Sequence, residues 1–245
     1  MRSAVITGVS RGLGAALFDE LNAAGDRILA LGRTFTDTQR AAARAEPRRI
    51  QLRLTDLTDP ASLPDAAELA AFLGDPGTTE VLLVHNAATF EPFAPIGALD
   101  PGDVVTAVAL NLTAAILLTN ALFAGDPIPP DATEVRASGP AVTVVFISSA
   151  AAHRVSGGRS VYSSTKRAGE TFFASLKEER AHDKRVRVVI VDPGIMDTDM
   201  QAVVRRHARG DAYFPGRERF IDRYERGELP APADVARKIM TEHLR

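Results

Sequence analysis

Short apolar runs recur along the chain, and segments long enough for helices separate them. Six runs are nearly continuous in apolar character, which is typical of strands buried on both faces of a parallel sheet. These runs are residues 4–7, 27–32, 50–54, 81–85, 142–148 and 186–192. The intervening pattern predicts helices at 12–24, 60–72, 101–124 and 161–181, and a last one at 232–244. This alternation predicts an α/β fold, a Rossmann-type doubly wound parallel β-sheet flanked by helices.

Two further segments lack the strand pattern. Residues 124–141 are rich in proline and glycine and predict a surface loop before the fifth or sixth strand. Residues 199–226 are polar with scattered aromatics, and we expect short helices over one end of the sheet. We therefore predict one domain over residues 1–245, with 195–226 as a substrate-binding lid and no seventh strand.

Composition excludes several classes of site. The 245 residues carry a net charge of −2, which does not favour nucleic acid, and the basic stretch 203–210 fits a solvated helix face. The absence of cysteine excludes disulfides, thiolate catalysis and cysteine-based zinc sites. No histidine or carboxylate spacing suggests a metal. We find no signal peptide and no run near the roughly 18 apolar residues of a membrane helix, so we expect a cytoplasmic protein without membrane contact.

A glycine-rich loop joins the first predicted strand to the first predicted helix. It reads ITGVSRGLG over residues 6–14, with Gly8, Gly12 and Gly14 between the two elements. Glycines let the backbone approach an anion, and a helix N-terminus offers unpaired N–H groups and the positive end of a dipole. The placement in the first βα unit predicts a dinucleotide phosphate site rather than a merely structural turn.

The second predicted strand ends without a carboxylate. An acidic residue there usually binds the ribose 2′-hydroxyl of NAD, whereas this strand ends LGRT with Arg33. Arg11 lies in the glycine loop, and two guanidinium groups suit a 2′-phosphate. The sequence therefore favours NADP(H) over NAD, although two solvated arginines at a loop edge remain an alternative.

A tyrosine stands four residues before a lysine in SVYSSTKRAG, residues 160–169. In a helix, Tyr162 and Lys166 share one face. A free phenol has a pKa near 10, and a nearby ammonium should lower that pKa toward the range useful in catalysis. Alone the pair is a loose pattern that also fits a surface tyrosine covered by a lysine stem.

Seven motifs in order resemble the short-chain dehydrogenase/reductase family over nearly the whole chain. They are TGVSRGLG at 7–14, Asp56 with Leu57, HNAA at 85–88, Asn111, Ser149 in FISSA, YSSTK at 162–166 and DPG at 192–194. Ser149 stands thirteen residues before Tyr162, which is the usual family spacing. Together the motifs are far more specific than any one of them.

The resemblance implies a role for each matching residue. Tyr162 becomes the general acid in reduction, Ser149 hydrogen-bonds the substrate oxygen, Lys166 reaches Tyr162 and the cofactor ribose, and Asn111 holds a water that links Lys166 to solvent. The implied catalytic set is Asn111, Ser149, Tyr162 and Lys166. The implied NADP(H)-binding set is Gly8, Ser10, Arg11, Gly12, Leu13, Gly14, Arg33, Asp56, Leu57, Asn86, Ala87, Ala88, Tyr162, Lys166, Pro193, Gly194, Ile195 and Thr198. Thr198 also suits the N-cap of a following helix.

Within the family, the segment PGIMDTDMQ at 193–201 looks most like sepiapterin reductases and bacterial benzil reductases. This resemblance implies an NADPH-dependent carbonyl reductase acting on a small aromatic or cyclic carbonyl compound. The implied substrate-binding residues are Ser149, Ala150, Tyr162, Met196 and Met200. Further candidates for an apolar wall are Thr89–Phe93, 150–155 and Tyr213–Phe214, with flexible methionines that suit flat ligands.

Several alternatives stay open at this point. The same four residues also serve alcohol dehydrogenases and 3-oxoacyl reductases, and the fold alone also suits a non-catalytic NADP(H) sensor. Ala88 replaces the family's usual glycine, which is tolerable if the backbone angles there are ordinary. His85 is more typical of a packed histidine than of a catalyst, and His153 suits either a pocket mouth or a solvated loop. Without a seventh strand we expect a homodimer through 101–124 and 161–181, or a monomer.

Overall fold

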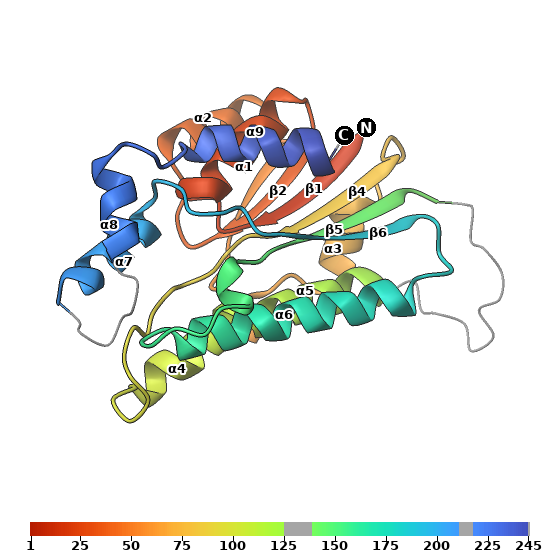
Figure 1. The fold of residues 1–245 in the computed structure, drawn as a ribbon. Helices are drawn as coiled ribbons and strands as arrows, with labels where there is room; N and C mark the ends of the chain where they lie inside the picture. Colours follow the sequence, from red (N-terminus) through yellow and green to blue (C-terminus); the bar gives the residue numbers. More distant parts are fainter. Residues whose placement is uncertain (125–138, 211–217, 245) are drawn as a thin grey trace.

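Six parallel strands form one sheet in the computed structural model, which describes residues 1–124, 139–210 and 218–244 (Figure 1). The strands are β1 (Arg2–Thr7), β2 (Arg27–Gly32), β3 (Ile50–Leu54), β4 (Glu80–His85), β5 (Ala141–Ile147) and β6 (Val186–Val191). Their order across the sheet is β3-β2-β1-β4-β5-β6. This is the order of the Rossmann fold, with its switch point between β1 and β4. The doubly wound α/β fold predicted from the sequence is confirmed.

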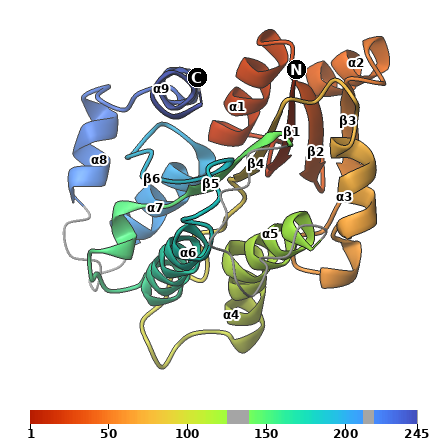
Figure 2. The ribbon, with the colours of Figure 1, turned by 90° about the vertical axis from the view of Figure 1, so that its right-hand side faces the viewer.

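Helices cover both faces of the sheet (Figures 1 and 2). One face carries α1 (Gly12–Ala23), α2 (Asp37–Ala45) and α9 (Pro232–His243), and the other carries α3 (Ala66–Leu73), α5 (Ala114–Phe123) and α6 (Ser160–Glu179). The helices α4 (Pro101–Val108), α7 (Asp199–Gly210) and α8 (Glu218–Glu225) complete the described set. Both α7 and α8 lie beyond one end of the sheet, as the sequence predicted for residues 199–226 (Figure 1).

Alternate strand residues serve the two faces. Ala4 and Ile6 join the core under α1 and α9, whereas Val5 between them joins the core under α5 and α6. All three side chains are at most 1 % exposed. Because both faces are covered, the strands are apolar at nearly every position, which is why the sequence pattern identified them.

The single helix predicted at 60–72 is wrong, because the structure has two separate helical segments there. A 3₁₀ turn, η1, spans Pro60–Ser62, and α3 begins only after Asp65. Leu63 has extended backbone angles before Pro64, since proline disfavours the helical conformation of the residue before it. Asp65 then starts α3 with a reciprocal capping box, in which its side chain accepts from the Glu68 N–H.

A second helix, α2, was not predicted at all. Its nine residues are mostly polar or alanine, and Gln39 is its one buried side chain. The local signal is the capping box between Thr36 and Gln39, in which each side chain accepts from the other residue's N–H. A helix of this kind lacks the apolar stripe on which the sequence prediction relied.

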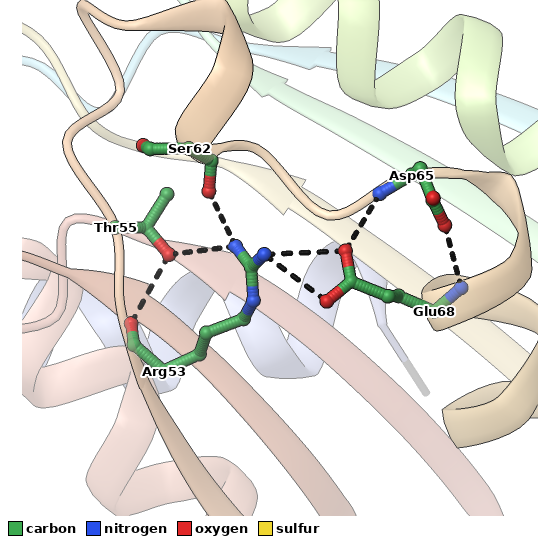
Figure 3. A network of polar contacts seen from close by, with 5 residues as sticks. All are labelled: Arg53, Thr55, Ser62, Asp65 and Glu68. Carbon is green, nitrogen blue, oxygen red and sulfur yellow. Dashed lines mark hydrogen bonds and ion pairs between the residues drawn. The ribbon is translucent and has the colours of Figure 1, made fainter.

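A polar network anchors the loop after β3 (Figure 3). The Arg53 guanidinium donates to Thr55 Oγ1 at 3.2 Å, to the Ser62 carbonyl at 2.5 Å and to both carboxylate oxygens of Glu68 at 3.2 Å. Ser62 Oγ in turn donates to the Asp56 carbonyl at 2.6 Å. Residues 55–58 are thereby held between the end of β3 and the start of α3.

The helix predicted at 101–124 is continuous but not uniform. Between α4 and α5, residues Ala109–Thr113 form one π-helical turn, η2. By length and composition the 23 residues Pro101–Phe123 could cross a membrane, which corrects the expectation that no such run exists. Ala114, Ala115 and Leu118 pack in the core against the sheet, so a core role accounts for part of this apolar character. Dimer formation through this helix stays a prediction.

The other predicted strands and helices have nearly the predicted bounds. Most of the predicted loop 124–141 and part of the predicted lid 195–226 lie outside the described residues. In the described ranges no seventh strand is present, and β6 has a strand neighbour on one side only. Arg187 on β6 is exposed and donates to the His243 carbonyl at 2.6 Å.

Gly169 sets the distance between α6 and β5. A methyl group at Gly169 would lie 2.3 Å from Cζ of Phe146, a side chain that is 1 % exposed. Phe146 also stacks on Phe173 with ring centroids 4.8 Å apart, so it has little room to move. The absence of a side chain at 169 therefore lets α6 approach the sheet.

We predict that Gly169→Ala lowers the free energy of unfolding by about 1–3 kcal/mol through overpacking, despite the roughly 1 kcal/mol of helix propensity that alanine gains. Urea denaturation measures this. Ala168→Gly, at the exposed neighbouring position, reports the propensity contribution alone. A Gly169→Ala protein more stable than wild type would contradict the packing argument.

Candidate active site

One large cavity of about 660 Å³ opens at the carboxyl ends of the strands. Segments that follow all six strands line it, as expected for a ligand site at the switch point of a doubly wound sheet. Every residue predicted to bind the cofactor lies in this lining. Other lining residues, which the sequence did not single out, are Gly32, Thr34, Thr55, Thr58, Leu110, Ile147, Ser148, Asp199, Gln201, Val204 and Phe220.

The glycine loop is shaped by a close approach to the end of β4. A side chain at Gly14 would lie 2.0 Å from the Gly8 carbonyl oxygen and 2.4 Å from Asn86 Nδ2. Gly8 has φ +71°, a conformation that disfavours side chains. Helix α1 starts at Gly12, and its N-cap residue Arg11 makes no side-chain capping bond. The first N–H groups of α1 are therefore offered to the cavity rather than to a capping side chain.

Asn86 ties the loop to β4. Its side-chain amide donates to the Thr7 carbonyl at 3.1 Å and to the Gly8 carbonyl at 3.0 Å. Thr7 Oγ1 returns the contact by accepting from the backbone N–H groups of Asn86 and Ala87, each at 3.1 Å. No non-glycine residue in the described chain has a positive φ, so Ala88 is accommodated without backbone strain.

Arg33 and Asp56 border the cavity at the ends of β2 and β3. Both are exposed, and Asp56 Oδ1 accepts from the backbone N–H of Thr58 at 2.9 Å and from its hydroxyl at 2.7 Å. These hydrogen bonds lower the pKa of Asp56, with a smaller contribution from the Arg33 charge. No carboxylate follows β2 in the lining, where Gly32, Arg33 and Thr34 stand.

Arg11 is exposed but has a charged partner. Its guanidinium forms an exposed ion pair with Asp199 at the start of α7, with a nitrogen–oxygen distance of 3.4 Å. Exposed pairs of this kind contribute little to stability, so Arg11 can exchange this partner for an anion in the cavity. Thr198 beside Asp199 lines the cavity and also accepts from the Gln201 N–H at 3.3 Å, so it does serve as a helix cap.

Tyr162 and Ser149 meet inside the cavity. Tyr162 is 6 % exposed, and Ser149 lines the same cavity close enough to influence the phenol. Burial raises the pKa of the Tyr162 phenol above its usual value, opposed by the Ser149 hydrogen bond, while Asp192 raises it and Arg159 lowers it by smaller amounts. The expectation that Lys166 lowers this pKa is therefore not met, because burial outweighs the contributions of Ser149 and Arg159 that lower it.

Lys166 lies one turn further along α6 and is 2 % exposed. Its Nζ donates to the Ile147 carbonyl at 2.7 Å and lies 5.8 Å from the centre of the Tyr162 ring. Burial lowers the pKa of Lys166 to about 8. A cation is held here at an energetic penalty, which is typical of a functional position.

Asn111 lies in the π-helical turn and is 1 % exposed. Its side-chain amide accepts from the Thr89 N–H at 2.7 Å, and donates to the Thr89 carbonyl at 2.9 Å and to Thr165 Oγ1 at 3.2 Å. Asn111 does not line the cavity itself, whereas Leu110 beside it does. Single π-helical turns often mark functional sites, because they redirect a side chain from the helical pattern.

Apolar side chains make the opposite end of the cavity. Phe90, Tyr162, Val204 and Phe220 belong to one buried cluster under α7 and α8, and Met200 packs against it. The predicted substrate residues Ser149, Tyr162, Met196 and Met200 all line the cavity, but Ala150 does not. The predicted candidates Tyr213 and Phe214 lie outside the described residues. Val204 follows Met200 by four positions, and this helical spacing was the available signal for it.

These features agree with comparisons to known proteins. A family model described as short chain dehydrogenase matches residues 2–209. The chain belongs to the short-chain dehydrogenase family.

Two relatives and one solved structure illustrate the similarity. A benzil reductase ((S)-benzoin forming) of Bacillus cereus is 29% identical over 98% of this chain and 92% of its own length. A sepiapterin reductase of Xenopus tropicalis is 28% identical over 96% of this chain and 88% of its own. The crystal structure of the KRED1-Pglu enzyme superimposes with a TM-score of 0.79 at 26% identity, covering 100% of this chain and 95% of that one.

This short-chain dehydrogenase is an oxidoreductase of a family that binds a nicotinamide cofactor. The cavity fits such a group. The uncapped N-terminus of α1 and the narrow Gly8–Gly14 turn suit a diphosphate. The lining residues 55–58 suit the adenosine end, and Pro193–Thr198 border the end near Tyr162.

The two histidines noted in the sequence take different positions. His85 is buried, and its Nε2 lies 2.9 Å from Thr119 Oγ1, which itself donates to the Ala115 carbonyl. Burial lowers the pKa of His85 to about 3, so it is a neutral packed side chain as expected. His153 stands at the surface, outside the cavity lining, and contacts Glu170 and Arg167.

We predict that the buried Lys166 lowers the folding stability of this short-chain dehydrogenase at neutral pH. Its folded-state pKa of about 8 lies below that of the unfolded chain. Between those two values the unfolded state binds the extra proton, so stability rises with pH across this window. Relative to Lys166→Met, the wild type should gain roughly 1–3 kcal/mol between pH 7 and pH 10.5.

Chemical denaturation of both proteins at several pH values measures this difference. Lys177→Met, at an exposed position of the same helix, should show no such trend. A difference between wild type and Lys166→Met that is flat with pH would contradict the prediction.

Proposed function

We propose that the protein is an NADPH-dependent carbonyl reductase that transfers a hydride to a ketone of a small aromatic or cyclic dicarbonyl compound. The observation that carries this proposal is the position of Tyr162 and Ser149. They stand where the polar part of one cavity, lined by the glycine loop, meets an apolar part lined by aromatic side chains and methionines.

Reduction of a ketone needs a hydride on carbon and a proton on oxygen. The nicotinamide cofactor supplies the hydride when it is bound. The Tyr162 phenol donates the proton, and Ser149 orients the carbonyl oxygen toward it. Ser149 Oγ accepts from the Ala151 N–H at 3.2 Å, which leaves its own hydroxyl hydrogen for the phenol or the substrate.

The Tyr162 phenol is in the protonated form that reduction of a ketone requires, because burial raises its pKa. Burial keeps the phenol protonated at neutral pH, so a proton is present before the substrate arrives. Lys166 carries its charge close to the phenol ring and limits the energetic penalty of the phenolate that proton transfer leaves behind. Asn111 acts at a distance, since it holds the Thr89 backbone and Thr165, whose hydroxyl donates to the Tyr162 carbonyl at 2.9 Å.

The preference for NADPH rests on the end of β2. Arg33 lines the cavity with an exposed guanidinium, and no carboxylate follows β2 in the described lining to bind an unphosphorylated ribose. Arg11 adds a second cation to the cavity lining, where it forms an exposed ion pair with Asp199. Two guanidinium groups match the charge and geometry of a 2′-phosphate.

The substrate class follows from the apolar end. The Phe90 ring lies 4.9 Å from the Tyr162 ring, centre to centre, and Met196 and Met200 complete a wall that suits a flat ligand. Benzil and sepiapterin reductases are among the relatives. The lining residues Met196, Met200, Val204 and Phe220 carry no charge, and the carboxylate beside them, Asp199, disfavours anionic substrates.

We predict that the protein oxidises NADPH in the presence of benzil, and that Tyr162→Phe lowers kcat by about 10²–10⁴-fold by removing the proton donor. NADPH absorbance measures the rate, with sepiapterin and a 3-oxoacyl thioester as further substrates. Tyr224→Phe, on an exposed face of α8, is the matched control. Reduction of the thioester alone would replace the proposed substrate class, and activity that persists in Tyr162→Phe would exclude the proposed mechanism.

We also predict that Arg33→Ala raises the KM for NADPH at least tenfold and leaves the KM for NADH nearly unchanged. One or two hydrogen bonds to a charged phosphate contribute about 1.5–3 kcal/mol each, which corresponds to this loss. Arg48→Ala removes an exposed arginine outside the cavity lining and serves as control. Equal effects of Arg33→Ala on both cofactors would show that Arg33 does not read the 2′-phosphate.

A further inference from the structure

Glu170 is a carboxylate that no step of the proposed reaction uses. It lies on α6 one turn after Lys166, and its side chain is 15% exposed. It faces the turn after β5, where Ser149 stands, rather than the solvent. The contacts of its two oxygens explain what it does there.

Each oxygen of Glu170 holds a different end of the same short segment, residues 148–153. Oε1 accepts from Ser148 Oγ at 2.6 Å, and Ser148 is 3 % exposed. Oε2 lies 2.8 Å from His153 Nε2. One side chain on α6 therefore contacts both the first and the last residue of the segment.

The neighbouring side chains Arg167 and His153 show which groups the Glu170 carboxylate binds. Arg167 NH1 lies 3.6 Å from Glu170 Oε2 and 3.0 Å from His153 Nδ1. Arginine has only donors, so Nδ1 accepts from Arg167 and the proton of a neutral His153 is on Nε2, directed at Glu170. Lys166, the other cation nearby on α6, is directed instead at the Ile147 carbonyl. Glu170 is thus the acceptor at the centre of the cluster.

The segment 148–153 contains Ser149, the proposed catalytic serine. Ser149 begins the 3₁₀ turn η3 (Ala150–Ala152), and the His153 N–H donates to the Ala150 carbonyl at 3.1 Å to close that turn. At its start, the Ser148 N–H donates to the Val191 carbonyl of β6 at 2.7 Å. Glu170 adds a contact to each end of this segment, to Ser148 and to His153, and Ser149 lies between them.

We propose that Glu170 is a positioning residue that holds the 148–153 turn so that Ser149 stays beside Tyr162 in the cavity. This inference rests on the proposed function, in which Ser149 and Tyr162 act on the substrate. Ser148 has a role by the same argument. Its hydroxyl donates to Glu170 and so does not compete with Ser149 for the substrate oxygen.

Kinetics of substituted proteins test the proposal. Glu170→Ala removes both acceptors, and we expect kcat for benzil to fall about tenfold with the KM for NADPH within about twofold, since misplaced catalytic groups reduce turnover more than binding. Glu170→Gln keeps one oxygen for Ser148 and should retain most of kcat. Glu178→Ala, at an exposed glutamate of the same helix, should behave as wild type.

A double-substitution cycle distinguishes positioning from general damage. If Glu170 acts through Ser149, then Glu170→Ala should lower kcat less than twofold in a Ser149→Ala background. An equal tenfold loss in both backgrounds would overturn the proposal, as would a Glu170→Ala protein with the kcat of wild type. If Glu170→Ala fails to fold, Ser148→Ala removes the donor of the same bond and enters the cycle in its place.

A substrate-free measurement separates this proposal from the proposed function. The chain has three tyrosines, so phenolate absorbance against Tyr162→Phe isolates the titration of Tyr162. Both substitutions at 170 remove one negative charge, but only Glu170→Ala releases Ser148, and the Ser149 hydrogen bond favours the phenolate. Tyr162 should therefore titrate at higher pH in Glu170→Ala than in Glu170→Gln.

The two titrations and the benzil assay together give distinct outcomes. The expected titration order without benzil reduction would support the role of Glu170 and reject the proposed substrate. Benzil reduction that depends on Tyr162, with identical titrations and equal kcat in both Glu170 proteins, would reject the role of Glu170 alone.

Discussion

The contact between the first glycine turn and the end of β4 determines where everything else in the site lies. Asn86 donates to two carbonyl oxygens of this turn, and Thr7 accepts two backbone N–H groups in return. Gly14 has no side chain because that space is already filled by the Gly8 carbonyl and the Asn86 amide. The two halves of the sheet are joined at the switch point by these bonds, and the cavity opens directly beyond them.

The two ionisable side chains Tyr162 and Lys166 are buried, which folding alone would not favour. Lys166 is a cation buried at 2 % exposure with one carbonyl acceptor in the described residues, and Tyr162 is a phenol whose ionisation is opposed by burial. The buried charge of Lys166 is unfavourable for stability, whereas the buried phenol of Tyr162 stays in the protonated form that can donate a proton. Asn111 and Glu170 lie on helical segments that pack against the sheet, whereas Ser148 and Ser149 follow β5. The packing of the sheet and its helices therefore offsets the loss of stability that the buried charge in the site causes.

Much of the fold and the cavity could be predicted from sequence, because the relevant signals are local. Strands buried on both faces are apolar at nearly every position, and the glycine turn and the Tyr162–Lys166 spacing are short motifs. Helix α2 was missed because it buries little, and α3 was misplaced because Pro64 interrupts an otherwise continuous pattern. The direction of the Tyr162 pKa shift and the grip of Glu170 on Ser148 and His153 depend on burial and on partners distant in sequence. Such facts emerge only when the chain is folded.

Strand β6 has one strand neighbour in the described part of the chain, and that arrangement carries a hazard. An open strand edge presents a row of backbone donors and acceptors that can recruit a strand from another molecule and start aggregation. The β6 sequence VRVVIV is otherwise almost wholly apolar and β-branched, and Ile190 is 40% exposed. Arg187 interrupts this run with an exposed charge directed at the end of α9. Arg187 therefore also places a charge on this edge, and exposed charges on strand edges oppose edge-to-edge pairing between molecules.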